Sequence, residues 1–348
     1  MNYFFLIILL IITSTTLAQT DSIVKAKILD DQQEPDRLYN QSIDKYSKND
    51  YEGALIDLNQ AINLRASFQE ALLQRGIVYY QLNKYSEAIG DFETVNKIVP
   101  KHESFYYLGQ ISEKRNEKKT ALSYYSQSIS INKQYSPAYY SKGVVFFEMG
   151  DFYQAIQQLD SAILYKQDDV FAFNDRASAK MSLNQLDEAM LDYSSALKIN
   201  ADYAWLHNNI GSLKRKKGDL KGAIASYDNA VAKKADYYLA YNNRGTAKHE
   251  AGDFKGAIAD FTKAIEIKSD YAFAYNNRAG SKQKLNDLSG ALIDCDKAIQ
   301  LDPTYGLAFL NRGILKDAKQ DYKGACVDWN KAHQLGVELA AKYLEVCE

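Results

Sequence analysis

The chain contains the motif Gly252-Asp253-Phe254-Lys255-Gly256-Ala257-Ile258, which recurs as Gly150-Asp151-Phe152-Tyr153-Gln154-Ala155-Ile156 and as Gly218-Asp219-Leu220-Lys221-Gly222-Ala223-Ile224. Alignment on the alanine of this motif gives nine copies, each 34 residues after the last except for one step of 33. The aligned alanines are Ala54, Ala88, Ala121, Ala155, Ala189, Ala223, Ala257, Ala291 and Ala325. A period of this length is typical of a solenoid, in which each repeat packs on its neighbours. We number this alanine as position 20 of its repeat.

Each repeat predicts two helices joined by a tight turn. Position 15 is Gly or Asn in eight of the nine copies, and these residues best tolerate the left-handed backbone that ends a helix. Position 8 is always small and position 27 mostly so, which lets two helices approach closely. Positions 20, 24 and 27 form a stripe at helical spacing, with large side chains such as Tyr227 and Phe261 at position 24. We therefore expect the first helix to end near position 14 and the second to begin near position 18.

This pattern resembles the tetratricopeptide repeat (TPR) family over residues 35–339. The resemblance implies an all-α fold, a right-handed superhelical solenoid of about nine TPR helix pairs with a C-terminal capping helix. Residues 336–348 are expected to form this cap, because a terminal repeat needs a cover for its exposed core. The single short step predicts a local irregularity near residues 100–120. The repeats are expected at 35–68, 69–102, 102–135, 136–169, 170–203, 204–237, 238–271, 272–305 and 306–339.

The N-terminus predicts export. Residues 1–18 carry no charged side chain and include the apolar run Phe4 to Ile12, which is too short to span a bilayer. Thr16 and Ala18 supply the small residues of a cleavage site before Gln19. We expect a signal peptide at 1–18, a linker or cap at 19–34, and a periplasmic or secreted protein that inserts in no membrane after cleavage. The alternative is a membrane tether through an uncleaved signal.

Composition and spacing argue against several classes of function. The 42 basic and 44 acidic residues leave a net charge of −2, so no basic surplus points to nucleic acid. The four histidines are far apart and lack metal-ligand spacing, and no glycine-rich phosphate loop occurs. We expect no catalytic residue, no metal and no cofactor, and hence no enzyme.

Two charged patterns follow the repeat. Whenever position 7 is Arg, position 23 is Asp, which predicts an ion pair between the two helices of one repeat. The five pairs are Arg75 with Asp91, Arg176 with Asp192, Arg244 with Asp260, Arg278 with Asp294, and Arg312 with Asp328. Position 11 is Lys in the last five repeats (Lys180, Lys214, Lys248, Lys282 and Lys316), which is either an anion-binding ladder or a row of partners for nearby acids; we favour the second.

Of the three cysteines, two are candidates for a disulfide. Cys326 lies early in the last repeat's second helix, and Cys347 lies near the end of the expected cap. If these helices fold back about residues 335–336, the two thiols meet, and an exported protein encounters oxidising conditions. Cys295 occupies core position 24 and is expected to be a buried thiol.

The TPR resemblance implies that the first helix of each repeat lines a groove. Positions 5 and 6 there hold asparagines, whose amides can donate to and accept from a peptide backbone; the alternative is that they only satisfy local backbone groups. These candidates are Asn174, Asn208, Asn242 and Asn276 at position 5, and Asn209, Asn243, Asn277 and Asn311 at position 6. Repeats 3 and 4 instead carry Tyr106, Tyr107 and Tyr140, which are aromatic candidates for contacts with a partner; the alternative is core packing, which is the more common role of aromatic residues at helical spacing.

These features lead to one main functional hypothesis and two alternatives. The main hypothesis is an exported scaffold that binds another protein or an extended peptide in its groove. One alternative is a non-catalytic regulatory subunit of an envelope enzyme complex. The other is an enzyme, for which no motif gives support. Fold alone does not choose the partner.

Overall fold

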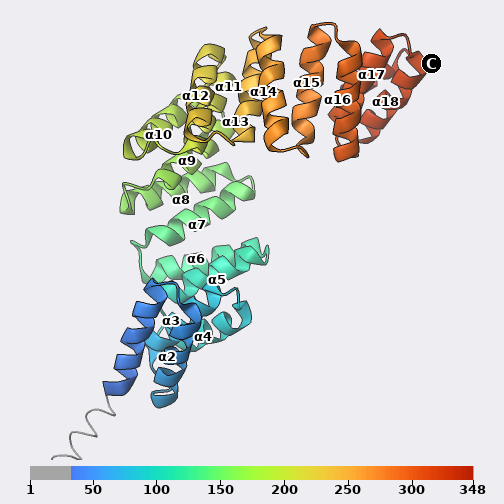
Figure 1. Ribbon diagram of the computed structural model, residues 1–348. Helices are drawn as coiled ribbons and strands as arrows, with labels where there is room; N and C mark the ends of the chain where they lie inside the picture. Colours follow the sequence, from blue (N-terminus) through green and yellow to red (C-terminus); the bar gives the residue numbers. More distant parts are fainter. Residues whose placement is uncertain (1–32, 348) are drawn as a thin grey trace, which may run out of the picture. The chain divides into compact units, whose positions relative to one another are not determined.

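The computed structural model describes residues 33–347. The expected signal peptide at 1–18 and all but the last two residues of the segment 19–34 lie outside this part. All regular elements within it are helices, and all but the last follow one another as nine antiparallel pairs in chain order (Figure 1). The first helix is described over 33–47. The all-α expectation is confirmed for the described residues.

The helix bounds repeat with the period of the sequence. The first pair is the helix at 33–47 with α2 (Tyr51–Leu64), and the others follow in order. They are α3 (Gln69–Gln81) with α4 (Tyr85–Ile98), α5 (His102–Lys114) with α6 (Lys118–Ile131), α7 (Ser136–Glu148) with α8 (Phe152–Tyr165), α9 (Val170–Ser182) with α10 (Leu186–Ile199), α11 (Ala204–Lys216) with α12 (Leu220–Lys233), α13 (Tyr238–Glu250) with α14 (Phe254–Ile267), α15 (Ala272–Lys284) with α16 (Leu288–Leu301), and α17 (Gly306–Ala318) with α18 (Tyr322–Gln334).

The turn between the two helices of each pair has the predicted left-handed residue. Position 15 has positive φ in all nine repeats, from Asn83 at 58° to Gly252 at 84°. Gln320 adopts the same conformation, with φ of 67°, although its side chain is neither Gly nor Asn. In six repeats the next residue is an Asp whose side chain caps the following helix, as Asp253 Oδ1 does by accepting from Gly256 N at 2.9 Å.

Large side chains at position 24 fill the space that the small residues at position 8 leave open. Tyr125, Tyr193 and Tyr227 are fully buried, and so is the Cys295 thiol. A Cβ added to Gly211 would stand 2.6 Å from the ring of Tyr227, so a larger residue there would force the ring to move. The core is therefore a repeated contact between two positions of one hairpin.

The irregularity expected near 100–120 is confined to a linker. The helices α5 and α6 have 13 and 14 residues, as do their counterparts in the other repeats. Only three residues, 99–101, join α4 to α5, whereas four join α6 to α7. Removing a linker residue preserves the packing of the helices on either side.

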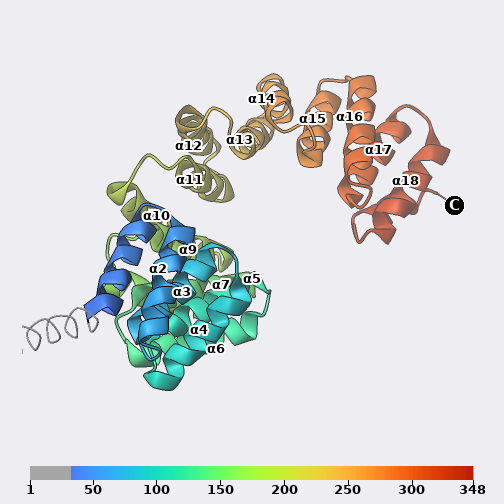
Figure 2. The same cartoon turned by 60° about the horizontal axis from the view of Figure 1, so that its bottom comes forward.

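The chain divides into two compact bodies between Gln167 and Asp168, which we call the N-terminal body and the C-terminal body. In the C-terminal body the helices α14 to α18 follow one another in both views (Figures 1 and 2). The chain ends in α19 (Ala340–Leu344), which is shorter than the cap expected over 336–348. Gly336 explains the difference, because its φ of 85° ends α18 and a turn precedes α19. No helix in residues 33–347 is long and apolar enough to cross a membrane.

Candidate functional site

The arginines at position 7 bind the aspartates at position 23 through two hydrogen bonds each. In repeat 7, Arg244 Nε and Nη2 donate to Asp260 Oδ2 and Oδ1 at 2.9 and 2.5 Å, and Asp260 is 4% exposed. The other four pairs, Arg75–Asp91, Arg176–Asp192, Arg278–Asp294 and Arg312–Asp328, have the same two-bond geometry at 2.5–3.0 Å. The hydrogen bonds to Asp328 raise the pKa of Arg312. These residues form structural ion pairs.

The lysines at position 11 complete the same network. Lys248 Nζ lies 2.8 Å from Asp260 Oδ2, and Lys180, Lys282 and Lys316 contact the position-23 aspartates of their own repeats at 2.7–2.8 Å. In repeat 6 the acceptor is a serine, and Lys214 Nζ donates to Ser226 Oγ at 3.1 Å. These lysines are occupied by neighbouring side chains, as the second interpretation had it, and do not form an anion-binding ladder.

The arginines also join consecutive repeats, which the sequence comparison missed. Arg244 Nη1 donates to Asp228 Oδ1 at 2.7 Å, and Asp228 belongs to the second helix of the preceding repeat. Arg75, Arg278 and Arg312 make the corresponding contact with Asn59, Thr262 and Asp296 at 2.7–3.0 Å. The acceptor always occupies position 25, and its polar character there was the available signal. Each such guanidinium therefore fixes both its own hairpin and the preceding one.

The asparagines of the C-terminal body form a hydrogen-bonded ladder among themselves. Each position-6 amide donates to the position-5 carbonyl oxygen of the preceding repeat, as Asn243 Nδ2 does to Asn208 Oδ1 at 2.9 Å. The other three bonds are Asn209 to Asn174 at 2.9 Å, Asn277 to Asn242 at 3.1 Å, and Asn311 to Asn276 at 2.8 Å. The position-5 side chains are buried and the position-6 side chains are half-buried. Position 5 thus has a structural role, and position 6 reaches the surface.

Part of this ladder lines a pocket of about 300 Å³ between α13, α15 and α17. Its polar lining includes His249, Asn276, Asn277, Gln283, Lys284 and Asn311. Burial, and then the charge of Lys284, lower the pKa of His249, whose Nδ1 lies 2.8 Å from Ser281 Oγ. The pocket therefore offers amides, a neutral imidazole and one ammonium group. Within residues 33–347 no group of three His, Cys, Asp or Glu side chains is placed to hold a metal ion.

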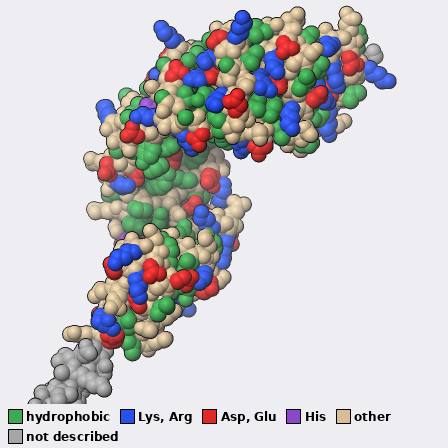
Figure 3. Space-filling view, viewed as in Figure 1, with side chains coloured by type: hydrophobic (Ala, Val, Ile, Leu, Met, Phe, Trp, Pro, Cys, Tyr) green, Lys and Arg blue, Asp and Glu red, His purple; other side chains and the backbone are tan. Residues whose placement is uncertain are grey.

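The aromatic candidates lie in the N-terminal body and are half-buried. Tyr106 and Tyr107 have ring centroids 5.4 Å apart, and Tyr107 also stacks on core residue Phe92 at 5.6 Å. Tyr140 lies on α7. Figure 3, which colours tyrosine with the hydrophobic side chains, shows such side chains gathered over this helix. Charged side chains of both signs cover the C-terminal body on the same view. At positions 5 and 6 of the first helices, repeats 3 and 4 of the N-terminal body thus carry these tyrosines, whereas the C-terminal body carries mostly asparagines.

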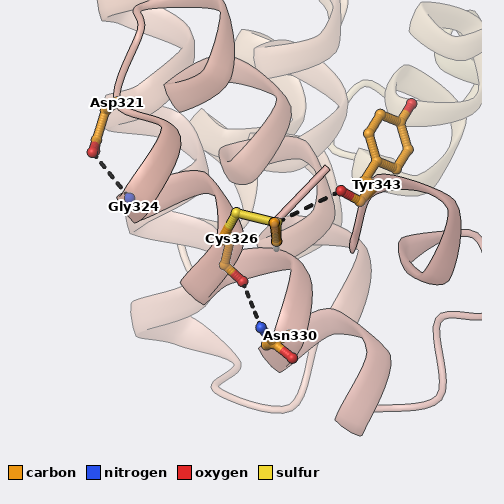
Figure 4. The surroundings of a disulfide bond; sticks show 6 residues. Asp321, Gly324, Cys326, Asn330 and Tyr343 are labelled. Atoms are coloured by element: carbon orange, nitrogen blue, oxygen red, sulfur yellow. Dashed lines mark hydrogen bonds between the residues drawn. A yellow bond between two sulfur atoms is a disulfide. The ribbon is translucent and has the colours of Figure 1, made fainter. Parts of the chain in front are cut away.

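The two cysteines near the C-terminus are joined. Cys326 on α18 and Cys347 after α19 form a disulfide with Cα atoms 5.7 Å apart (Figure 4). The end of α19 is also held by the ring of Tyr343, which lies 5.1 Å from that of Trp329. The third cysteine, Cys295, is a buried free thiol whose pKa burial raises to about 12. The disulfide thus fastens the short cap to the last repeat.

Three family models of tetratricopeptide repeats match the chain. One family model, described as TPR repeat, matches residues 177–214. Two others, described as tetratricopeptide repeat, match residues 136–169 and residues 39–103 and 208–272. Together the matches cover more than half of the chain. The chain belongs to the tetratricopeptide repeat family.

A curated relative and several solved structures are similar to this TPR protein. Tetratricopeptide repeat protein 13 of Homo sapiens is 26% identical over 126 residues, which make up 36% of this chain. The match spans only 15% of the length of that relative.

Among solved structures, a TPR protein from Parabacteroides merdae has a TM-score of 0.59 at 17% identity, covering 70% of this chain and 97% of its own. Pseudomonas aeruginosa PilF has a TM-score of 0.54 at 17% identity, covering 61% and 97%. PilW, a type IV pilus biogenesis factor, has a TM-score of 0.53 at 21% identity, covering 59% and 93%. At these identities the likeness shows the TPR fold.

Proposed function

We propose that this TPR chain is an exported scaffold that binds a partner protein or an extended peptide along the first helices of its repeats. The observation that carries the proposal is the row of position-6 asparagines in the C-terminal body. Their ladder bonds use one N–H of each amide, which leaves the second N–H of each for a ligand. The Oδ1 atoms of Asn243, Asn277 and Asn311 accept no hydrogen bond from the part of the chain that the structure describes.

A peptide backbone suits this row. Its amide units alternate donors and acceptors, and the row offers both at a regular spacing. The adjacent pocket, whose lining includes Gln283 and Lys284, has room for a side chain of such a peptide. A non-catalytic role agrees with the charged side chains at positions 7, 11 and 23, which pair with one another in a repeating pattern.

Export is part of the same proposal. It is supported by the uncharged N-terminal stretch with its apolar run, and by the Cys326–Cys347 disulfide. A disulfide of this kind persists in oxidising compartments and is rare in the cytosol of mesophiles. Periplasmic or secreted localisation follows, and the signal at 1–18 would be absent from the mature chain.

The experiment is partner capture with a matched pair of variants. Tagged residues 19–348 would be used to capture proteins from an envelope extract, in parallel with a chain carrying Asn209→Ala, Asn243→Ala and Asn277→Ala. The control carries Leu191→Ser and Ile293→Ser, which change side chains that are 69% and 68% exposed on second helices. We expect a partner that wild type and control retain and the folded asparagine variant loses. Equal capture by all three chains would place binding elsewhere and refute the role of the ladder.

A further inference from the structure

One carboxylate in the N-terminal body is enclosed by tyrosines and lacks an ionic partner. Glu113 lies in the last turn of α5 and is half-buried. Its Oε1 accepts a hydrogen bond from the hydroxyl of Tyr125. No Lys, Arg or His in residues 33–347 forms an ion pair with it, whereas Glu148 pairs with Lys118 at 3.1 Å and Glu250 pairs with Arg215 at 3.3 Å. Glu113 is therefore placed for a cation that the described chain does not supply.

The groups around Glu113 are held in place by hydrogen bonds from four helices. Gln110 Nε2 on α5 donates to Tyr125 OH on α6 at 2.8 Å and to Ser141 Oγ on α7 at 3.0 Å. Tyr80 OH on α3 donates to Gln110 Oε1 at 3.4 Å. This network fixes the direction of the carboxylate. Oε2 of Glu113 accepts nothing from the described residues and remains for a ligand.

Tyrosine rings surround the same place. Tyr106 is the centre of the group, with its ring centroid 5.9 Å from that of Tyr125 and 5.5 Å from that of Tyr135. Tyr107 links this group to Tyr80 at 5.2 Å. Burial raises the pKa of Tyr80 and Tyr106, so their hydroxyls stay neutral near pH 7. Neutral tyrosine rings attract cations through their faces.

The electrostatics also favour a cation. Burial, and to a smaller extent the charge of Glu148, raise the pKa of Glu113, whereas the Tyr125 hydrogen bond and the charge of Lys114 lower it; burial is the largest of these effects. A carboxylate that has lost water without gaining a counter-ion is an uncompensated charge, and an incoming cation removes that cost. In repeats 5 and 6 the hydroxyls equivalent to that of Tyr125 lie 3.1 Å from serines, and Met181 and Arg215 stand where Glu113 does. The arrangement therefore belongs to repeat 3 rather than to the fold.

We propose that Glu113 and the half-buried tyrosines Tyr80 and Tyr106 form a site for an arginine side chain of the partner peptide, with the carboxylate oriented by the buried Tyr125. A guanidinium fits better than an ammonium, because its planar fork matches a carboxylate and its face stacks on aromatic rings. This inference rests on the proposed function and adds the chemistry that the N-terminal body recognises. It differs from the proposed role of the asparagine row, which binds the peptide backbone of the partner and does not recognise its side chains.

The test uses a matched pair of short probes. Acetyl-Gly-Ser-Arg-Ser-Gly-amide and the same peptide with citrulline in place of arginine differ in charge but hardly in shape. Binding to residues 19–348 would be followed by ligand-observed NMR titration with wild type, Glu113→Gln and Glu148→Gln. Glu113→Gln keeps an acceptor for Tyr125, and Glu148→Gln removes a nearby carboxylate that already has a lysine partner.

We expect the citrulline peptide to bind wild type about tenfold more weakly than the arginine peptide, and Glu113→Gln to lose about the same factor. Glu148→Gln should stay within about twofold of wild type. Equal binding of the two peptides to wild type, or no binding of the arginine peptide, overturns the proposal without needing any variant to fold. So does wild-type affinity in a folded Glu113→Gln. If the asparagine variant still loses its partner in the capture experiment, only the arginine site is wrong and the scaffold function stands.

Discussion

Replacing Arg244 and Asp260 together should destabilise the C-terminal body less than the sum of the two single replacements. Arg244 donates two hydrogen bonds to Asp260, which is 4% exposed. Removing one partner of a buried ion pair costs about 3–5 kcal/mol, because the other charge is left uncompensated. Here Lys248 remains 2.8 Å from Asp260 and offsets part of that cost, so we expect about 2–3 kcal/mol for Arg244→Ile. The lost contact with Asp228 adds little, since that side chain is 55% exposed.

The preceding repeat supplies the design of the double variant. Repeat 6 has Ile210 at position 7 and Ser226 at position 23, and its Lys214 donates to Ser226 at 3.1 Å. Changing Arg244→Ile and Asp260→Ser together, with Lys248 unchanged, gives repeat 7 the same three residue types at positions 7, 23 and 11 as repeat 6. Asp260→Ser alone leaves the guanidinium without its carboxylate. The double variant should therefore recover about 2 kcal/mol of the summed losses of the two single variants.

The assay must report stability locally, because a repeat protein need not unfold in one step. Hydrogen exchange followed by mass spectrometry gives the free energy of opening for peptides of α13 and α14. Peptides of α17 and α18, held by the unchanged Arg312–Asp328 pair, serve as the internal control. If the losses of the two single variants add within about 0.5 kcal/mol, the two residues are energetically independent and the reasoning is refuted.

Two further predictions concern packing and the C-terminus. Gly313→Ala should lower the free energy of unfolding in urea by about 1–3 kcal/mol, because its Cβ would stand 2.5 Å from the Trp329 indole. Gly90→Ala, whose Cβ would meet nothing within 4 Å, should raise it by about 1 kcal/mol through helix propensity. Equal effects of the two substitutions would contradict the overpacking argument. Reduction of the Cys326–Cys347 disulfide, which spans 21 residues, should cost roughly 3 kcal/mol and speed amide exchange in residues 335–347 while leaving α13 unchanged. Unchanged exchange after reduction would show that the cap holds without it, and two freely alkylated thiols at 326 and 347 in the native exported chain would show that the bond does not form.

The sequence predicted those features that recur in every repeat. Nine copies aligned on one alanine located the turn at position 15, the small residues at position 8 and the large ones at position 24. The Arg244–Asp260 pairing could be predicted for the same reason, because positions 7 and 23 change together among the copies. A comparison within repeats acts as a small alignment, and it finds contacts inside a repeat.

Contacts between repeats were harder to predict. The contact of Arg244 with Asp228 joins position 7 to position 25 of the preceding repeat, where the acceptor is Asn, Asp or Thr in different copies. A guanidinium can donate a hydrogen bond to any of these side chains. The residue at position 25 therefore need not change together with the arginine at position 7 of the next repeat. The tyrosine network at Glu113 was missed for a different reason. It occurs in one repeat, and its residues come from four helices that the sequence does not bring together.

The asparagine row shows why a structural role and a binding role need not exclude each other. The two were posed as alternatives, yet an amide has two donors and an acceptor, and the ladder uses one donor of each position-6 side chain. The bond from Asn243 to the buried Asn208 fixes the direction in which the rest of that amide points. A ligand then binds to side chains that are already ordered, and less rotamer entropy is lost on binding. By this argument Asn208→Ala should weaken partner capture although Asn208 is buried, because it releases Asn243. The ladder in the C-terminal body and the network around Glu113 in the N-terminal body act in the same way. Each uses hydrogen bonds within the protein to orient a side chain for a ligand, an amide in one case and a carboxylate in the other.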